Sequence, residues 1–359
     1  MRDPLLVMPV VGIGRVEPGD DLAEAIAEAA PWIMDGDVVV VTSKIVSKAE
    51  GRLVEVPAQD GPERDAARDA VLAAETARLV ARRGPTQIVA THHGFVMAAA
   101  GVDASNVDIG RLVLLPKDPD ASARSLRAAL AERYGLHVAV IVSDTMGRPW
   151  RTGLTDVALG CAGLEPIRDH RGETDPYGNS LQLTQMAIAD ELAAAAELVK
   201  GKRDEVPVAV VRGYLAHPPA DDGPGALTMV RDSATDLFSL GTAEARAAGL
   251  ADAARLPYTA SFAAAEIDPM TVARAIGGVP LAASTSVRFV VTKGSNEVTL
   301  QCSAAREPAH LVALGMDVHR LRAALASEGL VTSIVAVELD DHESPPDSET
   351  VALAVGTAP

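Results

Sequence analysis

Two lysines follow directly on a run of four valines. The stretch VVVVTSKIVSKAEG, residues 38–51, places Lys44 and Lys48 four residues apart. On a helix, like charges at this spacing lie on one face and repel each other by roughly a few tenths of a kcal/mol. A phosphate between them would offset that cost, and Ser43 could donate a hydroxyl to it. The segment therefore indicates an anion site, and the alternative is a pair of solvated lysines.

A second polar group follows a run of small residues. In AAAGVDASN, residues 98–106, Asp103 and Asn106 come three positions apart. A carboxylate here could hold a cation beside a phosphate. An Asx turn or a helix cap is the alternative interpretation of the same residues.

The third group lies in IVSDTMGRPWR, residues 141–151. A buried strand delivers Asp144 and Thr145 at its carboxyl end, where open α/β sheets usually bind ligands. An aspartate with a neighbouring hydroxyl suits Mg²⁺ or Mn²⁺. Arg148 and Arg151 follow on a glycine-containing turn and suit a phosphate or carboxylate. A structural Asp–Arg ion pair is the alternative.

Together the three groups offer lysines for phosphate, two separated aspartates for metal and arginines for a second anion. This combination predicts a nucleotide-dependent phosphoryl-transfer site. The sequence contains no GxxxxGK[ST] motif, which excludes a P-loop.

Buried strands alternating with helices must position these residues. Asp21 caps a helix over 20–30, with Glu24 as its capping-box partner. Continuously apolar runs predict strands covered on both faces. The pattern predicts an α/β domain over residues 1–245, with strands at 38–41, 137–145 and 206–213 and helices at 63–83, 120–134 and 188–200.

Residues 246–359 have a different, Ala-rich character and predict a smaller α+β region. We expect a hairpin over 287–302 that turns at Gly294-Ser295-Asn296, a helix over 309–327 and a strand over 331–339. The acidic stretch 338–350 indicates a solvated loop, and VALAVG after it predicts a short edge strand.

Composition narrows the function classes. The chain of 359 residues is 48% hydrophobic with a formal net charge of -17, which argues against a nucleic-acid partner. Because no apolar run approaches the roughly 18 residues of a membrane span, we expect a cytoplasmic protein without a membrane partner. Cys161 and Cys302 lack metal-site spacing and are expected to be small buried side chains.

Three long motifs, TSKIVSKAEGR, AAGVDASN and SDTMGRPWRTGLTDVALGCAGL, occur in this order in a chain that opens with PVVGIG and PGDDL. They resemble the coenzyme F(420)-0:gamma-glutamyl ligase family over about residues 5–245. The resemblance implies a mixed-sheet ligase-like domain and a GTP-dependent ligase. Such an enzyme adds L-glutamate to coenzyme F(420)-0 through an acyl phosphate, and then adds a second, γ-linked glutamate.

The resemblance also implies roles for individual residues. The catalytic residues would be Asp103, Asp144 and Lys48, and Arg148 and Arg151 would contact the substrate. Mn²⁺ or Mg²⁺, as two divalent ions, would be held by Asp103, Asp144 and Thr145, with K⁺ as activator and a homodimer as the assembly. GTP would contact Ile13, Gly14, Arg15, Val16, Ser43, Lys48 and Asn106.

Two departures from the family accompany this resemblance. Some relatives carry a Gln or Glu metal ligand in the turn where this chain has Lys202. Glu197 and Gly201, with Lys202 at the end of the same helix, could face the same site. Residues 246–359 resemble a shortened nitroreductase-like domain without its arginine-rich, FMN-contacting segment, so we expect no reductase activity. The alternatives are a bifunctional enzyme that still reduces dehydro-F(420)-0 with FMN, and a non-catalytic nucleotide or deazaflavin binding protein.

Overall fold

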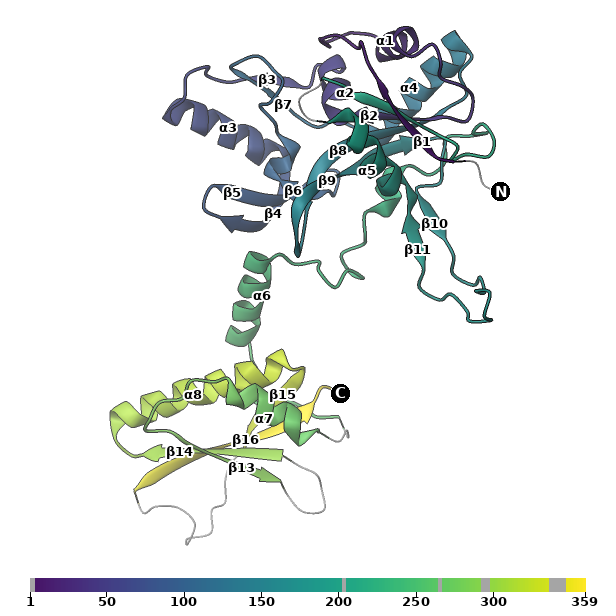
Figure 1. Cartoon of the computed structure of the whole chain (residues 1–359). Coiled ribbons are helices and arrows are strands. Elements are labelled where there is room, and N and C mark those ends of the chain that lie inside the picture. Colours follow the sequence, from purple (N-terminus) through teal and green to yellow (C-terminus); the bar gives the residue numbers. More distant parts are fainter. Residues whose placement is uncertain (1–3, 202–204, 264–266, 292–297, 336–346) are drawn as a thin grey trace. The chain divides into compact units, whose positions relative to one another are not determined.

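The structure of the chain, a computed structural model, describes residues 4–201, 205–263, 267–291, 298–335 and 347–359. It divides into two compact units, Met1–Ala243 and Glu244–Pro359, which Figure 1 draws with their helices and strands labelled. Each unit has its own buried core.

A five-stranded mixed sheet forms the centre of the N-terminal unit. Strand β2 is parallel to β8, and the other neighbouring pairs are antiparallel. All four valines of β2 are completely buried, which confirms a strand covered on both faces. The order across the sheet is β1 (Leu6–Val10), β12 (Val208–Arg212), β2 (Val38–Thr42), β8 (Ala139–Arg148) and β9 (Arg151–Ala162).

Helices cover both faces of this sheet because successive strand residues point to opposite sides. Val39 and Val41 pack in one core with α1 (Leu22–Ala29), α2 (Ser43–Ala49) and α4 (Pro119–Tyr134). Val38 and Val40 pack in the other core against α5 (Ile188–Lys200), whose bounds match the predicted helix. The predicted α/β architecture with a mixed sheet is confirmed.

Smaller elements occur along the chain between β2 and β8 and after β9 (Figure 1). Strands β3 and β7 pair with each other, as do β10 and β11, and β4, β5 and β6 form a three-stranded sheet. These elements are β3 (Leu53–Glu55), α3 (Pro62–Glu75), β4 (Thr76–Arg83), β5 (Thr86–Thr91), β6 (Val96–Ala98), η1 (Ala99–Gly101), β7 (Arg111–Val113), β10 (Ile167–Asp169), β11 (Gln185–Ala187) and η2 (Ala226–Met229).

The predicted helix over 63–83 is wrong after Glu75. Residues Thr76–Arg83 form β4, which pairs with β5 through a hairpin that turns at Gly84, where φ is +56°. Helical propensity is a weak preference, and the ladder with β5 overrides it. The β-branched Thr76 and the turn at Gly84-Pro85 are the local signals of this ending.

The third motif also differs from its prediction. Strand β8 does not end at Asp144 and Thr145 but continues to Arg148, and Arg151 begins β9. The turn between them contains Trp150, with a φ of +64°. Antiparallel pairing with β9 extends the strand past the point where its parallel partner β2 stops.

The C-terminal unit has an antiparallel sheet in the order β13-β14-β16-β15. Buried residues of α7 and α8 pack against it in one core. The VALAVG segment lies in β16, a central strand rather than the predicted edge strand, because it pairs on both sides. The elements are α6 (Thr242–Ala254), α7 (Pro269–Gly277), β13 (Ser286–Val291), β14 (Val298–Ala305), α8 (Pro308–Ser327), β15 (Leu330–Val335) and β16 (Ser348–Thr357).

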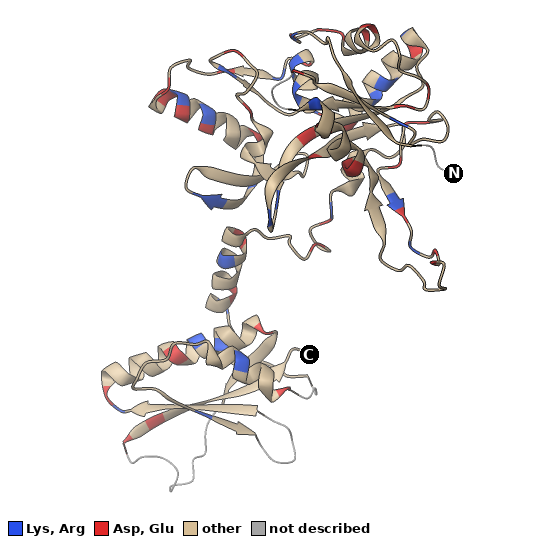
Figure 2. Cartoon of the chain, viewed as in Figure 1, with Lys and Arg blue, Asp and Glu red and all other residues tan. Residues whose placement is uncertain are grey.

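Two predictions for this unit lie outside the described residues: the turn at Gly294-Ser295-Asn296 and most of the acidic stretch 338–350. Both cysteines are buried, as predicted, and burial raises the pKa of Cys161 to about 12 and that of Cys302 to about 11. No described helix combines the length and apolar character of a membrane span. Basic and acidic residues are interspersed along α3 (Figure 2).

The contact between β9 and α4 leads to a stability prediction. A Cβ added to Gly160 would lie 2.2 Å from the backbone carbonyl of Pro119. Because backbone must move to relieve this clash, we expect Gly160→Ala to lower the free energy of unfolding by about 1–3 kcal/mol in urea titrations. The matched control is Gly147→Ala on the facing strand, whose Cβ would meet only the Leu154 side chain at 3.8 Å. Equal urea midpoints for the two variants would contradict the prediction.

The start of α1 leads to a pH-dependent prediction. Hydrogen bonds from Arg133 and from the Glu24 backbone lower the pKa of Asp21 from 3.8 to about 2. Since the folded pKa is depressed, the stabilisation is present above the unfolded value and is lost as pH falls through the folded one. We expect Asp21→Ala to cost about 1 kcal/mol at neutral pH, and the difference from the parent chain to shrink between about pH 4 and pH 2.

Asparagine also caps helices, so Asp21→Asn serves as the control. It removes only the ion pair with Arg133, whose side chains are 39% and 43% exposed. Such exposed pairs contribute modestly, so the stability of Asp21→Asn at neutral pH should lie between those of the parent chain and of Asp21→Ala, and its difference from the parent chain should shrink as the pH falls toward 2. A loss equal to that of Asp21→Ala would show that the charge, and not the cap, is what matters.

Candidate functional site

A cavity of about 850 Å³ lies where the carboxyl end of β2 meets β8. Six other segments contribute to its wall: the residues after β1, helix α2, the segment from β6 to just after β7, Leu154 of β9, the end of α5 and the residues before β12. The three motifs that the sequence singled out therefore converge on one space. The predicted site residues that line it are Ile13, Gly14, Arg15, Val16, Ser43, Lys48, Asp103, Asn106, Asp144 and Thr145.

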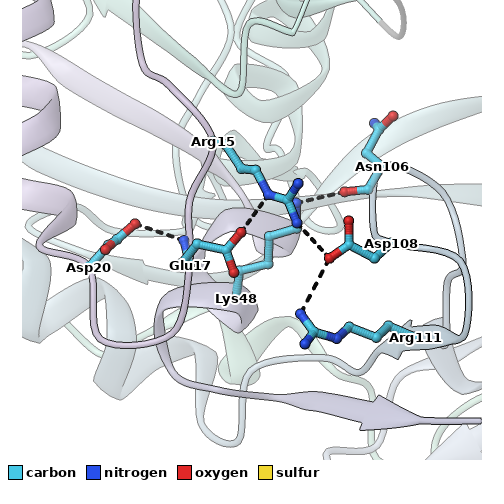
Figure 3. Close-up of polar contacts among 7 residues, drawn as sticks. All are labelled: Arg15, Glu17, Asp20, Lys48, Asn106, Asp108 and Arg111. Atoms are coloured by element: carbon cyan, nitrogen blue, oxygen red, sulfur yellow. Dashed lines mark hydrogen bonds and ion pairs between the residues drawn. The ribbon is translucent and has the colours of Figure 1, made fainter.

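Lys48 lies on α2, which begins directly after β2, so the lysine pair is helical. Its Nζ donates to the backbone carbonyl of Asn106 at 2.6 Å, across a separation of 58 residues (Figure 3). Asn106 has a φ of +55°, which turns the loop at this contact. Burial lowers the pKa of Lys48, and the nearby charges of Lys44 and Arg15 lower it further. This is the electrostatic setting in which an anion would be stabilised.

Arg15 joins two walls of the cavity. Its guanidinium lies between Glu17 and Asp108 (Figure 3), with 2.6 Å between Nη2 and the Asp108 carboxylate. Asp108 also accepts from Arg111 at 3.4 Å. The segment after β1 is thus held to the loop before β7 by exposed charge pairs, which contribute little to stability and can exchange partners with a ligand.

Asp103 is held by its neighbours. Its carboxylate pairs with Lys44 Nζ at 2.6 Å and accepts from both the backbone N–H and the hydroxyl of Ser105. Burial acts to raise the pKa of Asp103, but the hydrogen bonds from Lys44 and Ser105 outweigh it and leave the pKa lowered. The Asx turn, the alternative interpretation of this motif, is present, and the carboxylate lines the cavity as well.

A buried polar group lies behind Asp144 and Thr145. Thr145 donates to Asp156 at 2.7 Å, and Lys200 pairs with the same carboxylate at 2.9 Å. Lys200 is the last residue of α5 and is only 2% exposed. Burial acts to raise the pKa of Asp156, but the charge and hydrogen bond of Lys200 dominate and lower it.

The oxygen donors of the cavity suit a hard divalent cation. Asp103, Asp144 and Thr145 offer two carboxylates and a hydroxyl, and Mg²⁺ usually takes one or two carboxylates with phosphate and water. Among the described residues no group of three or more His, Cys, Asp and Glu side chains could hold a metal alone. The residues therefore fit a metal that a bound phosphate helps to coordinate, and not a closed structural site.

Not every predicted residue reaches the cavity. Arg148 and Arg151 are absent from its lining, since β8 and β9 carry them to the tip of the hairpin. The Nη1 atom of Arg148 is buried, and the structure shows no hydrogen-bond partner for it. The contacts of these arginines with substrate stay a prediction. Lys202 lies outside the described residues.

Sequence reasoning also missed lining residues. Ser105 lies in the second motif and Asp108 follows that motif by two residues, whereas Lys44, predicted with Lys48 as part of an anion site, does line the cavity. Lys200 had a signal: it follows Ala193 and Ala196 on the buried face of α5, where a lysine is unusual. Glu197, noted only as a weak candidate, also lines the cavity.

Comparison with known proteins agrees with this geometry. The F(420)-0:gamma-glutamyl ligase family matches residues 11–213, more than half of the chain, so the chain belongs to this family. A coenzyme F(420):L-glutamate ligase of Methanothermobacter thermautotrophicus is 44% identical over 245 residues, which are 64% of this chain and 96% of that protein. A ligase of the same name from Methanopyrus kandleri is 41% identical over 246 residues, which are 65% of this chain and 97% of that protein.

A solved FMN-dependent nitroreductase from Clostridium difficile aligns with 29% of this chain and 84% of its own length. With 10% identity and a TM-score of 0.24, this likeness supports no conclusion about fold or activity. The nitroreductase-like character of residues 246–359 stays a prediction.

Proposed function

We propose that the chain is a GTP-dependent ligase that adds L-glutamate to coenzyme F(420)-0 and then adds a second, γ-linked glutamate. The observation that carries the proposal is the shared cavity, which brings Lys48 together with Asp103 and Asp144. The names of the relatives support the acceptor and the amino acid. Two divalent ions, activation by potassium and a homodimer belong to the same proposal and rest on the family resemblance.

The chemistry needs an activated acyl group, because a carboxylate is a poor acyl donor. In the proposed reaction a carboxylate oxygen of coenzyme F(420)-0 attacks the γ-phosphorus of GTP, and GDP leaves with the electron pair of the broken P–O bond. The glutamate amine then attacks the acyl carbon, phosphate leaves, and the amine loses a proton to form the amide. Each glutamate added uses one GTP.

The side chains of the cavity divide this work. Lys48 binds the phosphates and stabilises the charge on the transferring group. Asp103, Asp144 and Thr145 hold divalent metal, which when bound neutralises phosphate charge. Lys44 pairs with Asp103 in the described structure, so it is placed to exchange this partner for a phosphate oxygen when the carboxylate turns to a cation.

Incubation with GTP, Mn²⁺, L-glutamate and coenzyme F(420)-0 tests the proposal directly. Mass spectrometry should show products heavier by one and then two glutamyl units, with matching release of phosphate. We expect Asp144→Asn to lower the rate by about a hundredfold or more, since it weakens metal binding at the phosphates. Asp69→Asn on the exposed face of α3 is the matched control and should retain full activity. If GTP binds but no glutamylated product forms with Mn²⁺ or Mg²⁺, the chain is a binding protein and not a ligase.

Phosphate binding by Lys48 is tested separately. Hydrogen bonds to charged groups are typically worth about 1.5–3 kcal/mol, so Lys48→Met should weaken GTP binding about ten- to hundredfold in calorimetry. Lys117→Met, at an exposed position outside the cavity, should leave the affinity unchanged. An equal affinity for Lys48→Met and the parent chain would remove Lys48 from the nucleotide site.

A further inference from the structure

The ion pair between Lys200 and Asp156 lies at the wall of the cavity, where Lys200 is a lining residue and Asp156 lies behind it. Each residue is 2% exposed, and 2.9 Å separates Nζ from Oδ2. Burying two charges is costly, and a buried pair is seldom more stabilising than apolar residues of the same size. The position of the pair at this wall suggests a role in positioning.

Lys200 lines the cavity, yet its ammonium faces protein acceptors. Nζ donates to Ser143 Oγ and to Asp156 at 2.9 Å each, and a Glu197 carboxylate oxygen lies 3.5 Å away. An ammonium has three N–H donors, and three acceptors surround this one. Lys200 is therefore occupied in holding Asp156 and is not a phosphate ligand.

Asp156 in turn determines the orientation of the Thr145 hydroxyl. Its Oδ2 accepts from Lys200 and Ser143, and its Oδ1 accepts from Thr145 Oγ1 at 2.7 Å. An ionised carboxylate can only accept, so Thr145 must donate its single proton to Asp156. The hydroxyl oxygen of Thr145 therefore offers only lone pairs to any other group.

We propose that Asp156 and Lys200 are positioning residues that hold the Thr145 hydroxyl as an acceptor toward the cavity, so that it can coordinate a divalent cation beside Asp144. This inference rests on the metal dependence of the proposed function. It explains why the charged side chains of Asp156 and Lys200 are buried here, since neutral side chains would not fix the hydroxyl in this orientation.

An asparagine at position 156 would reverse the arrangement. Lys200 requires an acceptor, so the amide oxygen would face Nζ and the amide NH₂ would face Thr145. Thr145 would then accept from the amide and turn its own proton toward the cavity, where a proton opposes a cation. The change keeps the shape of the side chain and alters only the direction of one hydrogen bond.

The test is Mn²⁺ affinity, measured by the electron paramagnetic resonance signal of free Mn²⁺, with and without GTP. Asp156→Asn should weaken Mn²⁺ binding by about tenfold or more, the usual effect of removing the partner that orients a metal ligand. Thr145→Val should cause a similar loss, while Thr145→Ser keeps the hydroxyl and most of the affinity. The double variant Thr145→Val/Asp156→Asn should bind no more weakly than Thr145→Val alone, because both changes act through one hydroxyl.

Asp37→Asn is a matched control. Asp37 is also buried, at 1% exposure, and its carboxylate pairs with Arg212 of β12 at 2.7 Å. Unlike the group around Thr145, this pair does not line the cavity. It should lower the melting temperature without changing Mn²⁺ affinity. If Asp156→Asn does not fold, Asp156→Asn/Lys200→Met removes both charges, and a severalfold loss of Mn²⁺ affinity is expected because the neutral amide no longer fixes the hydroxyl.

Unchanged Mn²⁺ affinity in the folded Asp156 variants would overturn the inference, as would losses that multiply in the double variant. Both results would leave the proposed ligase intact. Absence of Mn²⁺ binding by the parent chain, even with GTP present, would instead overturn the proposed metal dependence and the inference with it.

Discussion

The parallel pairing of β2 with β8 is the constraint on which the N-terminal unit depends. Its register sets Thr42 opposite Ser143, so the residues that follow on the two strands, Ser43 and Asp144, lie at the same edge of the sheet. Parallel neighbours require a long crossover connection. Here the crossover contains Asp103 and Asn106. The lysines and aspartates meet because this strand pair closes the loop that carries the second motif and places it beside the first and third.

The charge at the cavity depends on where the basic side chains lie and not on the net charge of the chain. The chain carries a formal net charge of -17, yet lysine and arginine side chains from three segments line one space. Each is partnered in the described structure: Arg15 with Asp108, Lys44 with Asp103, Lys48 with a backbone carbonyl and Lys200 with Asp156. These partners reduce the repulsion between the neighbouring basic side chains. A ligand that carries both phosphate and metal would replace the acidic partner of a basic side chain with phosphate and the basic partner of a carboxylate with metal.

The two units differ in how they use buried polarity. The N-terminal unit places a charged pair, Lys200 and Asp156, next to the cavity wall. The C-terminal unit buries Asp317, which accepts from the Ala282 backbone and from Arg320. It also buries Arg322, which donates to Thr332 Oγ1 at 3.0 Å. The apolar side chains of its core pack between α7, α8 and the sheet. This separate core is what makes residues 244–359 a unit in its own right.

Prediction from sequence succeeded where the signal was local. The helices at α4 and α5 end at Gly135 and Gly201, and α1 begins at its Asp21 cap, so short-range rules sufficed. It failed where pairing with another strand decided the outcome. Residues 76–83 have a helical pattern but pair with β5. The VALAVG segment lies in a central strand because its backbone pairs with strands on both sides.

The sequence by itself determined the chemistry available: lysines for anions, aspartates and a threonine for a cation, and the elements that carry them. Only the tertiary structure decided which of these side chains share a cavity. It carried Arg148 and Arg151 away on a hairpin tip and brought Lys200 to Asp156 from 44 residues along the chain. Burial and charge pairing depend on neighbours supplied by other segments, and no local pattern specifies them.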